Sequence, residues 1–419
     1  MAVEAHLPQR HDPFQPPTKP LEQALPDAAQ IPLQAFELPD FPPEAAHLKE
    51  LTLTSDIKPT EYADLLAKAL PENAVPKSIP KGIELLTLEL FSLGYPPSFL
   101  TSLSQELPRL KALTLYCHLI DGVSDASRKD AGEFMYNILT GNKENEGGLR
   151  ELHLLDIFCR RGFLAGLGSI LEELESSASS DSSASSDSSA AMRFLEVSYT
   201  YRGHSDPGFL SRIPGDELPL MLISSLIAAS FRLSPAPSEQ DNATGLSEQL
   251  PDDPAHVDAD GNRIPGQKPQ GIIPLSSAHP GTTLLVERLT RVARNTKEPE
   301  TVRSGKGPQA LKMLDCTLYT LTLDQLTLVI NHQTELAVLS ASVLVRTDEQ
   351  AKKSLLHTIQ SGSQALETVE LVGVPEEKLE EVSLPSSMND TTKLTILESL
   401  PLCFPRYFPH GIRNGSLVR

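Results

Sequence analysis

Two short stretches have residue types that could bind a ligand. Asp258-Ala-Asp260-Gly-Asn262 resembles the start of a calcium-binding loop, but it lacks the loop's other ligands in register and its closing glutamate. Gly305-Lys306-Gly307 resembles part of a phosphate-binding loop, but no Ser or Thr follows the lysine and no glycine precedes it at the required distance. We therefore interpret the first stretch as a flexible turn and the second as a linker.

The cysteines and histidines form no recognisable catalytic or metal-binding pattern. No CxxC pair is present, no cysteine has a histidine at ligand spacing, and the motifs G-x-S-x-G and H-E-x-x-H are missing. The cysteines each lie in or near an apolar run, which is typical of small buried thiols: Cys117, Cys159, Cys316 and Cys403. Among the histidines, a lone strand residue such as His153 is more often solvated or packed than a base. The sequence therefore predicts no catalytic residue, no metal and no cofactor.

The overall composition narrows the class of partner. The 419 residues carry a formal net charge of -19, and 39% of them are hydrophobic, with no tryptophan and only 5% aromatic residues. Such a surface repels nucleic acid phosphates and anionic lipids, so we expect neither as a direct ligand. The excess of leucine over aromatic residues suits repeated aliphatic layers better than one core with large anchors.

The distribution of apolar residues also predicts a compartment. The longest apolar stretch, Leu218–Phe231, is too short to span a bilayer, and residues 1–30 contain no apolar core of a secretory signal. We therefore expect a soluble protein of the cytoplasm or nucleus.

The elements that would position any functional residue form a repeated unit. A pattern L-x-x-L-x-L, or its close variant, predicts a strand, and a helix-like stretch follows it. The eight predicted strands contain residues 48–53, 83–88, 110–115, 149–154, 192–197, 311–316, 336–341 and 366–371. The corresponding helix-like stretches are residues 60–70, 97–107, 126–139, 162–174, 216–231, 323–331, 347–360 and 375–382. One such unit cannot bury its apolar face without neighbours, so the pattern predicts a stacked array.

A polar residue lies between the last two apolar positions of every predicted strand. This alternation is typical of a strand with one buried face and one open face, and the polar positions are Thr52, Thr87, Thr114, His153, Glu196, Asp315, Ser340 and Glu370. With the flanking residues of the open face added, the candidate protein-contact residues are Thr114, Tyr116, His153, Phe194, Glu196, Asp315 and Glu370. We expect a basic patch of a partner protein to meet Glu196, Asp315 and Glu370, and Met313 to add an apolar contact.

Composition divides the chain into five parts. Residues 1–45 are proline-rich and predict a disordered lead. Repeats follow over residues 46–232, with a disordered Ser-rich insert at 176–191. Residues 233–309 predict a mostly disordered insert that contains a helix over 282–295, and repeats resume over 310–400. Residues 401–419 predict a C-terminal cap or tail.

The repeated units resemble the leucine-rich-repeat family, in its long, ribonuclease-inhibitor-like variety, over residues 46–232 and 310–383. This resemblance implies an α/β solenoid with parallel strands on one face and helices on the other. The irregular spacing resembles the repeat part of fungal F-box-type proteins. The family's Asn or Cys three residues after the last strand leucine is replaced here, by Asp56, Phe91, His118, Ile157, Thr200, Tyr319, Leu344 and Val374. No F-box sequence precedes Leu48.

These observations favour a non-catalytic scaffold that binds another protein, because an open strand face is an extended contact surface and no motif indicates chemistry. Two alternatives remain. The F-box-type resemblance implies a substrate-recognition adaptor of a ubiquitin ligase. An enzyme on a mixed α/β fold, with catalytic residues dispersed along the sequence, would leave no local motif.

Overall fold

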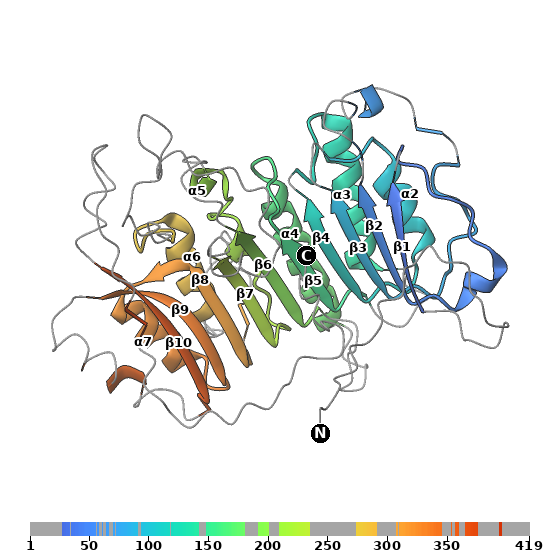
Figure 1. Ribbon diagram of the computed structural model, residues 1–419. Coiled ribbons are helices and arrows are strands. Elements are labelled where there is room, and N and C mark those ends of the chain that lie inside the picture. The colour runs from blue at the N-terminus through green and yellow to red at the C-terminus, as the bar shows by residue number, and fades with distance from the viewer. Residues whose placement is uncertain are drawn as a thin grey trace, which may run out of the picture.

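The leucines of the repeated pattern form the buried side of a long, mostly parallel β-sheet in a computed structural model (Figure 1). The structure describes residues 27–33, 35–55, 57, 61, 64–66, 70–71, 73–90, 94–117, 119–141, 148–180, 192–200, 209–234, 274–290, 307–308, 310–345, 353, 357–359, 365–375 and 394–395.

The sheet has eleven strands in chain order, so each strand pairs with its neighbours in sequence. The nine pairings from β1 to β10 are parallel, and the last strand, β11, lies antiparallel to β10. The strands are β1 (Ala28–Leu33), β2 (Glu50–Ser55), β3 (Leu85–Leu90), β4 (Ala112–Cys117), β5 (Glu151–Leu155), β6 (Phe194–Thr200), β7 (Ala228–Ser234), β8 (Met313–Leu321), β9 (Val338–Val345), β10 (Thr368–Pro375) and β11 (Leu394–Thr395).

The helices lie on one side of this sheet (Figure 1). They are η1 (Pro43–His47), α2 (Phe99–Glu106), α3 (Asp125–Thr140), α4 (Phe163–Ser180), α5 (Phe209–Arg212), η2 (Leu218–Met221), α6 (Pro280–Thr290) and α7 (Leu323–His332). Consecutive members from α2 to α7 pack side by side, with η2 between α4 and α6 and with α5 outside this row. The fold is therefore an α/β arrangement of a strand layer and a helix layer, and the described residues place no helix layer over the opposite sheet face.

The core lies between the two layers. Leu113, Leu152 and Leu195 occupy the same register position on neighbouring strands and are fully buried. Leu115, Leu154 and Val197 form the next buried line, two residues further along each strand. Because side chains alternate along a strand, the intervening polar residues point to the other face. The register predicted for these strands from their leucines is thus correct.

Strand β1 lies inside the segment 1–45, for which the sequence predicts a disordered lead. That prediction is wrong for residues 28–33, which form a strand, and for Leu33 and Phe36, which are buried in the core. Pro32 does not prevent the strand because β1 is at the edge of the described sheet, where a missing N–H costs least. The many prolines of this segment made its short run of alternating exposed and less exposed residues hard to recognise as a strand.

Strand β7 is a second difference, because the sequence predicts a helix over residues 216–231. The structure has the short η2 helix over Leu218–Met221 and then the strand Ala228–Ser234. Ala229, Phe231 and Leu233 alternate as buried strand residues. Since the apolar run 218–231 is nearly continuous, periodicity does not distinguish its helical part from its extended part.

The segments between the repeats are only partly described. Helix α6 lies within the insert 233–309, near the helix predicted for 282–295, and buries Leu285 and Leu289. Helix α4 continues to Ser180, so the Ser-rich stretch is helical over 176–180. Residues 181–191, 401–419 and most of the insert, including Asp258–Asn262, lie outside the described residues, as does Cys403.

Candidate functional site

The open face of the sheet carries one continuous central row of residues. Strand pairing joins Thr52 to Thr87, Thr87 to Thr114 and Thr114 to His153. The row then continues through Glu196, Ser230, Asp315, Ser340 and Glu370. All the central positions expected from the sequence are thus in register. Ser230 is an additional member that the sequence missed, because its strand was read as part of a helix.

The expected flanking residues lie in two further rows of the same face. Phe194 and Met313 belong to the row one side of the centre, with Ala228 between them. Tyr116 belongs to the other side, where it pairs with Leu155. The structure therefore brings Thr114, Tyr116, His153, Phe194 and Glu196 together on three neighbouring strands, β4 to β6. Asp315 and Glu370 lie on the same face further along it, on β8 and β10.

His153 is the most constrained member of the row. Its Nδ1 lies 2.7 Å from Oε2 of Glu196, and its Nε2 lies 3.7 Å from Oε2 of Glu151. The ring of Phe194 packs against the imidazole, with 5.0 Å between ring centroids. Burial lowers the pKa of His153, but hydrogen bonds and charges from Glu151 and Glu196 outweigh burial and raise the pKa to about 9. The imidazole is therefore a paired cation at neutral pH, which is unsuited to act as a general base.

Asp315 is also engaged within the protein. Its Oδ1 accepts hydrogen bonds from the backbone N–H of Thr317 at 3.0 Å and from the Thr317 hydroxyl at 2.7 Å. Burial raises the pKa of Asp315, and the nearby Glu370 acts in the same direction. Glu370 itself is exposed. The acidic end expected from the sequence is therefore uneven, since two of its carboxylates have internal partners and Glu370 is the exposed one.

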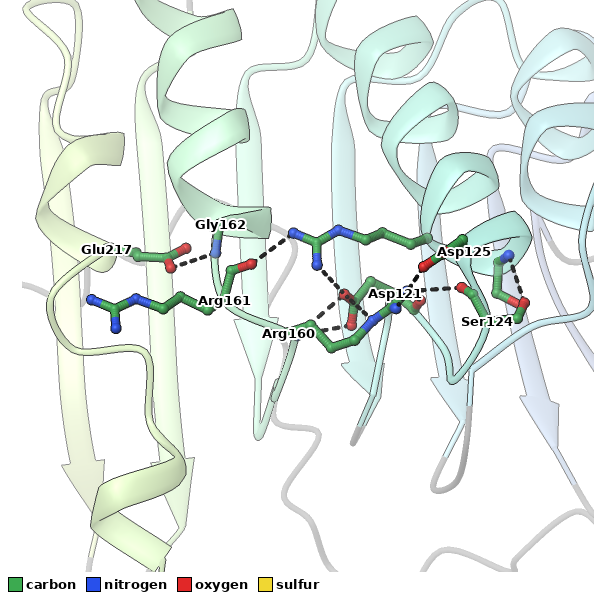
Figure 2. Close-up of polar contacts among 9 residues, drawn as sticks. Asp121, Ser124, Asp125, Arg160, Arg161, Gly162 and Glu217 are labelled. Carbon is green, nitrogen blue, oxygen red and sulfur yellow. Dashed lines mark hydrogen bonds and ion pairs between the residues drawn. The ribbon is translucent and has the colours of Figure 1, made fainter.

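A second polar cluster lies near the C-terminal ends of β4 and β5 (Figure 2). Asp121 is fully buried, and its carboxylate accepts hydrogen bonds from the backbone N–H and Nε of Arg160, both at 3.1 Å from the nearest oxygen. Nη2 of Arg160 donates to the carbonyl oxygens of Asp121 and Ser124. Nη2 of Arg128 donates to the carbonyl of Arg161. Every charged group at the centre of this cluster is thus paired, which indicates a structural role.

Other buried carboxylates bond backbone N–H groups of a neighbouring unit. Asp130 of α3 accepts from Leu100 and Thr101 in the first turn of α2. Glu217 accepts from the N–H groups of Gly162 and Ala165 at the start of α4, as Figure 2 shows for Gly162. Helix N-termini expose unbonded N–H groups that favour a negative charge. Each carboxylate therefore fastens one unit to the next.

Asp156 makes a similar contact at the strand ends. Its Oδ1 accepts a hydrogen bond from the backbone N–H of Thr200, 2.6 Å away, and its own N–H donates to Ser198. These acidic residues therefore connect neighbouring strand–helix units through backbone N–H groups. No pattern in the sequence identified these residues, because an isolated Asp or Glu is by default solvated.

The other residues singled out in the sequence are packed within the fold. Cys117 and Cys316 are buried free thiols, and burial raises the pKa of Cys117 to about 12. Gly307 packs closely against the backbone carbonyl of Arg288. Within the described ranges, no group of three or more His, Cys, Asp or Glu side chains could hold a metal ion. No helix in this part of the chain is both long and apolar enough to cross a membrane.

No protein-family model matches the chain, and no curated protein matches it in a search by sequence.

Proposed function

We propose that this chain is a leucine-rich-repeat-type solenoid that binds a partner protein on the open face of its sheet. Three features support the repeat assignment. Strands pair in chain order, helices pack beside one another on one side, and the buried leucines repeat at the same register position. Carboxylates such as Asp130, Asp156 and Glu217 supply the contacts between units.

The single observation that carries the proposed function is the continuity of the central row. Nine strands, β2 to β10, contribute one residue each, and most of these residues are partly exposed. With neighbouring strands about 4.8 Å apart, the row extends for about 38 Å. That length is comparable to the diameter of a typical protein–protein contact of standard size. Repeat proteins present extended surfaces of this kind.

The chemistry of the face also suits a protein. Hydroxyl groups, an ion-paired histidine and carboxylates form the central row, and the aromatic rings of Tyr116 and Phe194 flank it. Aromatic residues are enriched among those that dominate interfaces. Glu370 offers an exposed carboxylate to a basic group of the partner. We infer that the protein acts in the cytoplasm or nucleus, where the buried thiols of Cys117 and Cys316 stay reduced.

Site-specific photo-crosslinking in cells tests this proposal. A photoreactive amino acid would replace Thr87 or Ser340, two partly exposed members of the central row. Matched controls carry it at Tyr136 or Leu328, which are 52% and 47% exposed on α3 and α7. We expect discrete protein adducts from the two open-face positions and none from the helix positions. Adducts from the helix positions alone, or from none of the four, would refute the open face as the contact surface.

A further inference from the structure

A line of basic residues runs along the N-terminal ends of the central strands. Backbone hydrogen bonds place these residues side by side, because the N–H of Arg150 donates to Lys111 and that of Arg193 donates to Arg150. Ile227, the residue before β7, comes next in this line, and the N–H of Lys312 donates to its carbonyl. Each step is one strand, or about 4.8 Å. We call Arg150, Arg193 and Lys312 the basic rim.

The charges of the basic rim are not neutralised within the described part of the chain. Lys111, at the end of the line, is paired with Glu84 at 2.8 Å. Arg193 and Lys312 are exposed, and neither forms an ion pair among the described residues. Nε of Arg150 is buried and has no hydrogen-bond partner there.

An apolar strip lies directly beside the basic rim on the open face. It consists of Phe194, Ala228, Met313 and Val338, which occupy one register position on β6 to β9. All four are partly exposed. Each of the rim residues Arg193 and Lys312 immediately precedes a member of the strip in sequence. The sheet therefore presents apolar side chains with uncommitted positive charge along one border.

The acidic residues of the central row do not offer a comparable uncommitted charge at this place. Glu196 accepts from His153, and Asp315 accepts from Thr317. They line the far border of the apolar strip, two residues beyond Phe194 on β6 and Met313 on β8. A ligand on the strip thus finds free cations on one side and partly satisfied carboxylates on the other.

We infer that the apolar strip and basic rim bind a peptide segment of the partner that carries apolar side chains beside a line of carboxylates. This inference rests on the proposed function and names the chemistry of the partner. Burial of the apolar side chains drives association, and carboxylates paired with Arg150, Arg193 and Lys312 fix its orientation. In an extended segment that crosses the strands, successive side chains point to opposite sides. Acidic side chains that face the basic rim therefore alternate with apolar side chains that face the apolar strip.

The charge of the surroundings favours a short acidic segment over a polyanion. The chain carries a net charge of -19, and Glu151, Glu196 and Asp315 lie near the strip. A nucleic acid brings a phosphate at every nucleotide and would be repelled beyond the three rim cations. A peptide needs to place only two or three carboxylates at the rim.

Selection from a displayed library of random twelve-residue peptides, with the full chain as bait, tests this inference. We expect the selected peptides to be enriched in Asp and Glu together with Leu, Ile or Phe, and depleted in Lys and Arg. The variant R193E/K312E reverses two exposed rim charges, so it should lose these peptides and select basic ones. The control K77E/K129E makes the same change in net charge at exposed positions outside the rim and should select the wild-type peptides.

Fluorescence anisotropy with one selected peptide measures how much the rim charges contribute to its affinity. Its affinity for R193E/K312E should fall about tenfold or more, and its affinity for K77E/K129E should stay within about twofold. Basic peptides selected by the wild type, the same peptides selected by R193E/K312E, or no enrichment over the input would each overturn the inference. So would tighter binding of a single-stranded twenty-nucleotide oligonucleotide than of the peptide, with loss on R193E/K312E, because the rim would then serve a polyanion.

The crosslinking at Thr87 and Ser340 separates this failure from failure of the proposed function. Adducts at those positions combined with a failed selection would leave the open face as the contact surface and remove only the acidic–apolar segment. Loss of the adducts would remove both.

Discussion

Nδ1 of His153 and Oε2 of Glu196 lie 2.7 Å apart on adjacent strands, and they join the threonine end of the central row to its acidic end. Glu151 approaches the other ring nitrogen of His153. The polar group at the middle of the open face is therefore held in place, because two carboxylates keep the imidazole in one orientation.

The pairing predicts that the stability of the fold depends on pH. The pKa of His153 is about 9 in the folded chain, against 6.5 for an ordinary histidine. The folded state therefore holds a proton that the unfolded state releases between these values, so this contribution is full below pH 6.5 and is lost as pH rises through 9. E196Q should lower the pKa of His153 in an NMR titration and weaken the pH dependence of urea unfolding. E50Q, on the same face without a contact to His153, should change neither.

An unchanged pKa of His153 in E196Q would show that the pairing does not exist in solution. An equal loss of pH dependence in E50Q would assign the effect to the general charge of the face.

The buried leucine line predicts a large cost for a charge at its centre. Leu113 is fully buried and lies between Leu86 and Leu152 on the neighbouring strands. Leu113→Asp should lower the free energy of unfolding by about 3 kcal/mol or more, because the carboxylate is desolvated without a partner. Thr87→Asp places the same group on the open face and should change the melting temperature little. Similar melting temperatures for the two variants would contradict the register.

The Arg160 cluster predicts different costs for two neighbouring carboxylates. Arg160 contacts both Asp121, whose side chain is 0% exposed, and Asp125, whose side chain is fully exposed. Asp121→Asn should destabilise by about 1–3 kcal/mol, because Arg160 loses a buried charged acceptor. Asp125→Asn should leave thermal unfolding unchanged, because exposed ion pairs contribute little. Equal effects in differential scanning calorimetry would show that the cluster is not part of the packed structure.

The acidic end of the central row predicts a similar contrast. From the sequence, Glu196, Asp315 and Glu370 are three equivalent solvent-facing carboxylates. Glu370→Lys should keep the wild-type melting temperature, because Glu370 is exposed. Asp315→Lys should lower the melting temperature, because the substitution removes the two hydrogen bonds that Thr317 donates and desolvates a charged lysine. A melting temperature unaffected by Asp315→Lys would mean that this side chain is solvated.

Much of the fold could be predicted because a parallel strand repeats its own pattern. Leu113 and Leu115 alternate with Thr114, and the same alternation recurs at Leu152, His153 and Leu154. Aligning these triplets aligns the strands, since register follows the buried face. β7 was missed because its alternation follows a continuous apolar run, in which helix and strand have the same composition.

The contacts between units could not be predicted, because they depend on distances that sequence spacing does not reveal. Glu217 meets Gly162 from 55 positions away, and Asp156 meets Thr200 from 44 positions away. The basic rim could not be predicted for the same reason. Arg193 and Lys312 are unremarkable exposed residues in sequence, and only the strand order aligns them.

The most direct test of the account measures partner affinity after the crosslinked protein has been identified. Isothermal titration would compare Thr87→Arg and Ser340→Arg, on the central row, with Tyr136→Arg and Leu328→Arg, on the helix layer. We predict that each open-face variant weakens binding about tenfold or more with an unchanged melting temperature, because a bulky charge enters the contact. The two helix-layer variants should bind as the wild type does. Wild-type affinity for both open-face variants, or a loss confined to the helix layer, would contradict the open face as the binding surface.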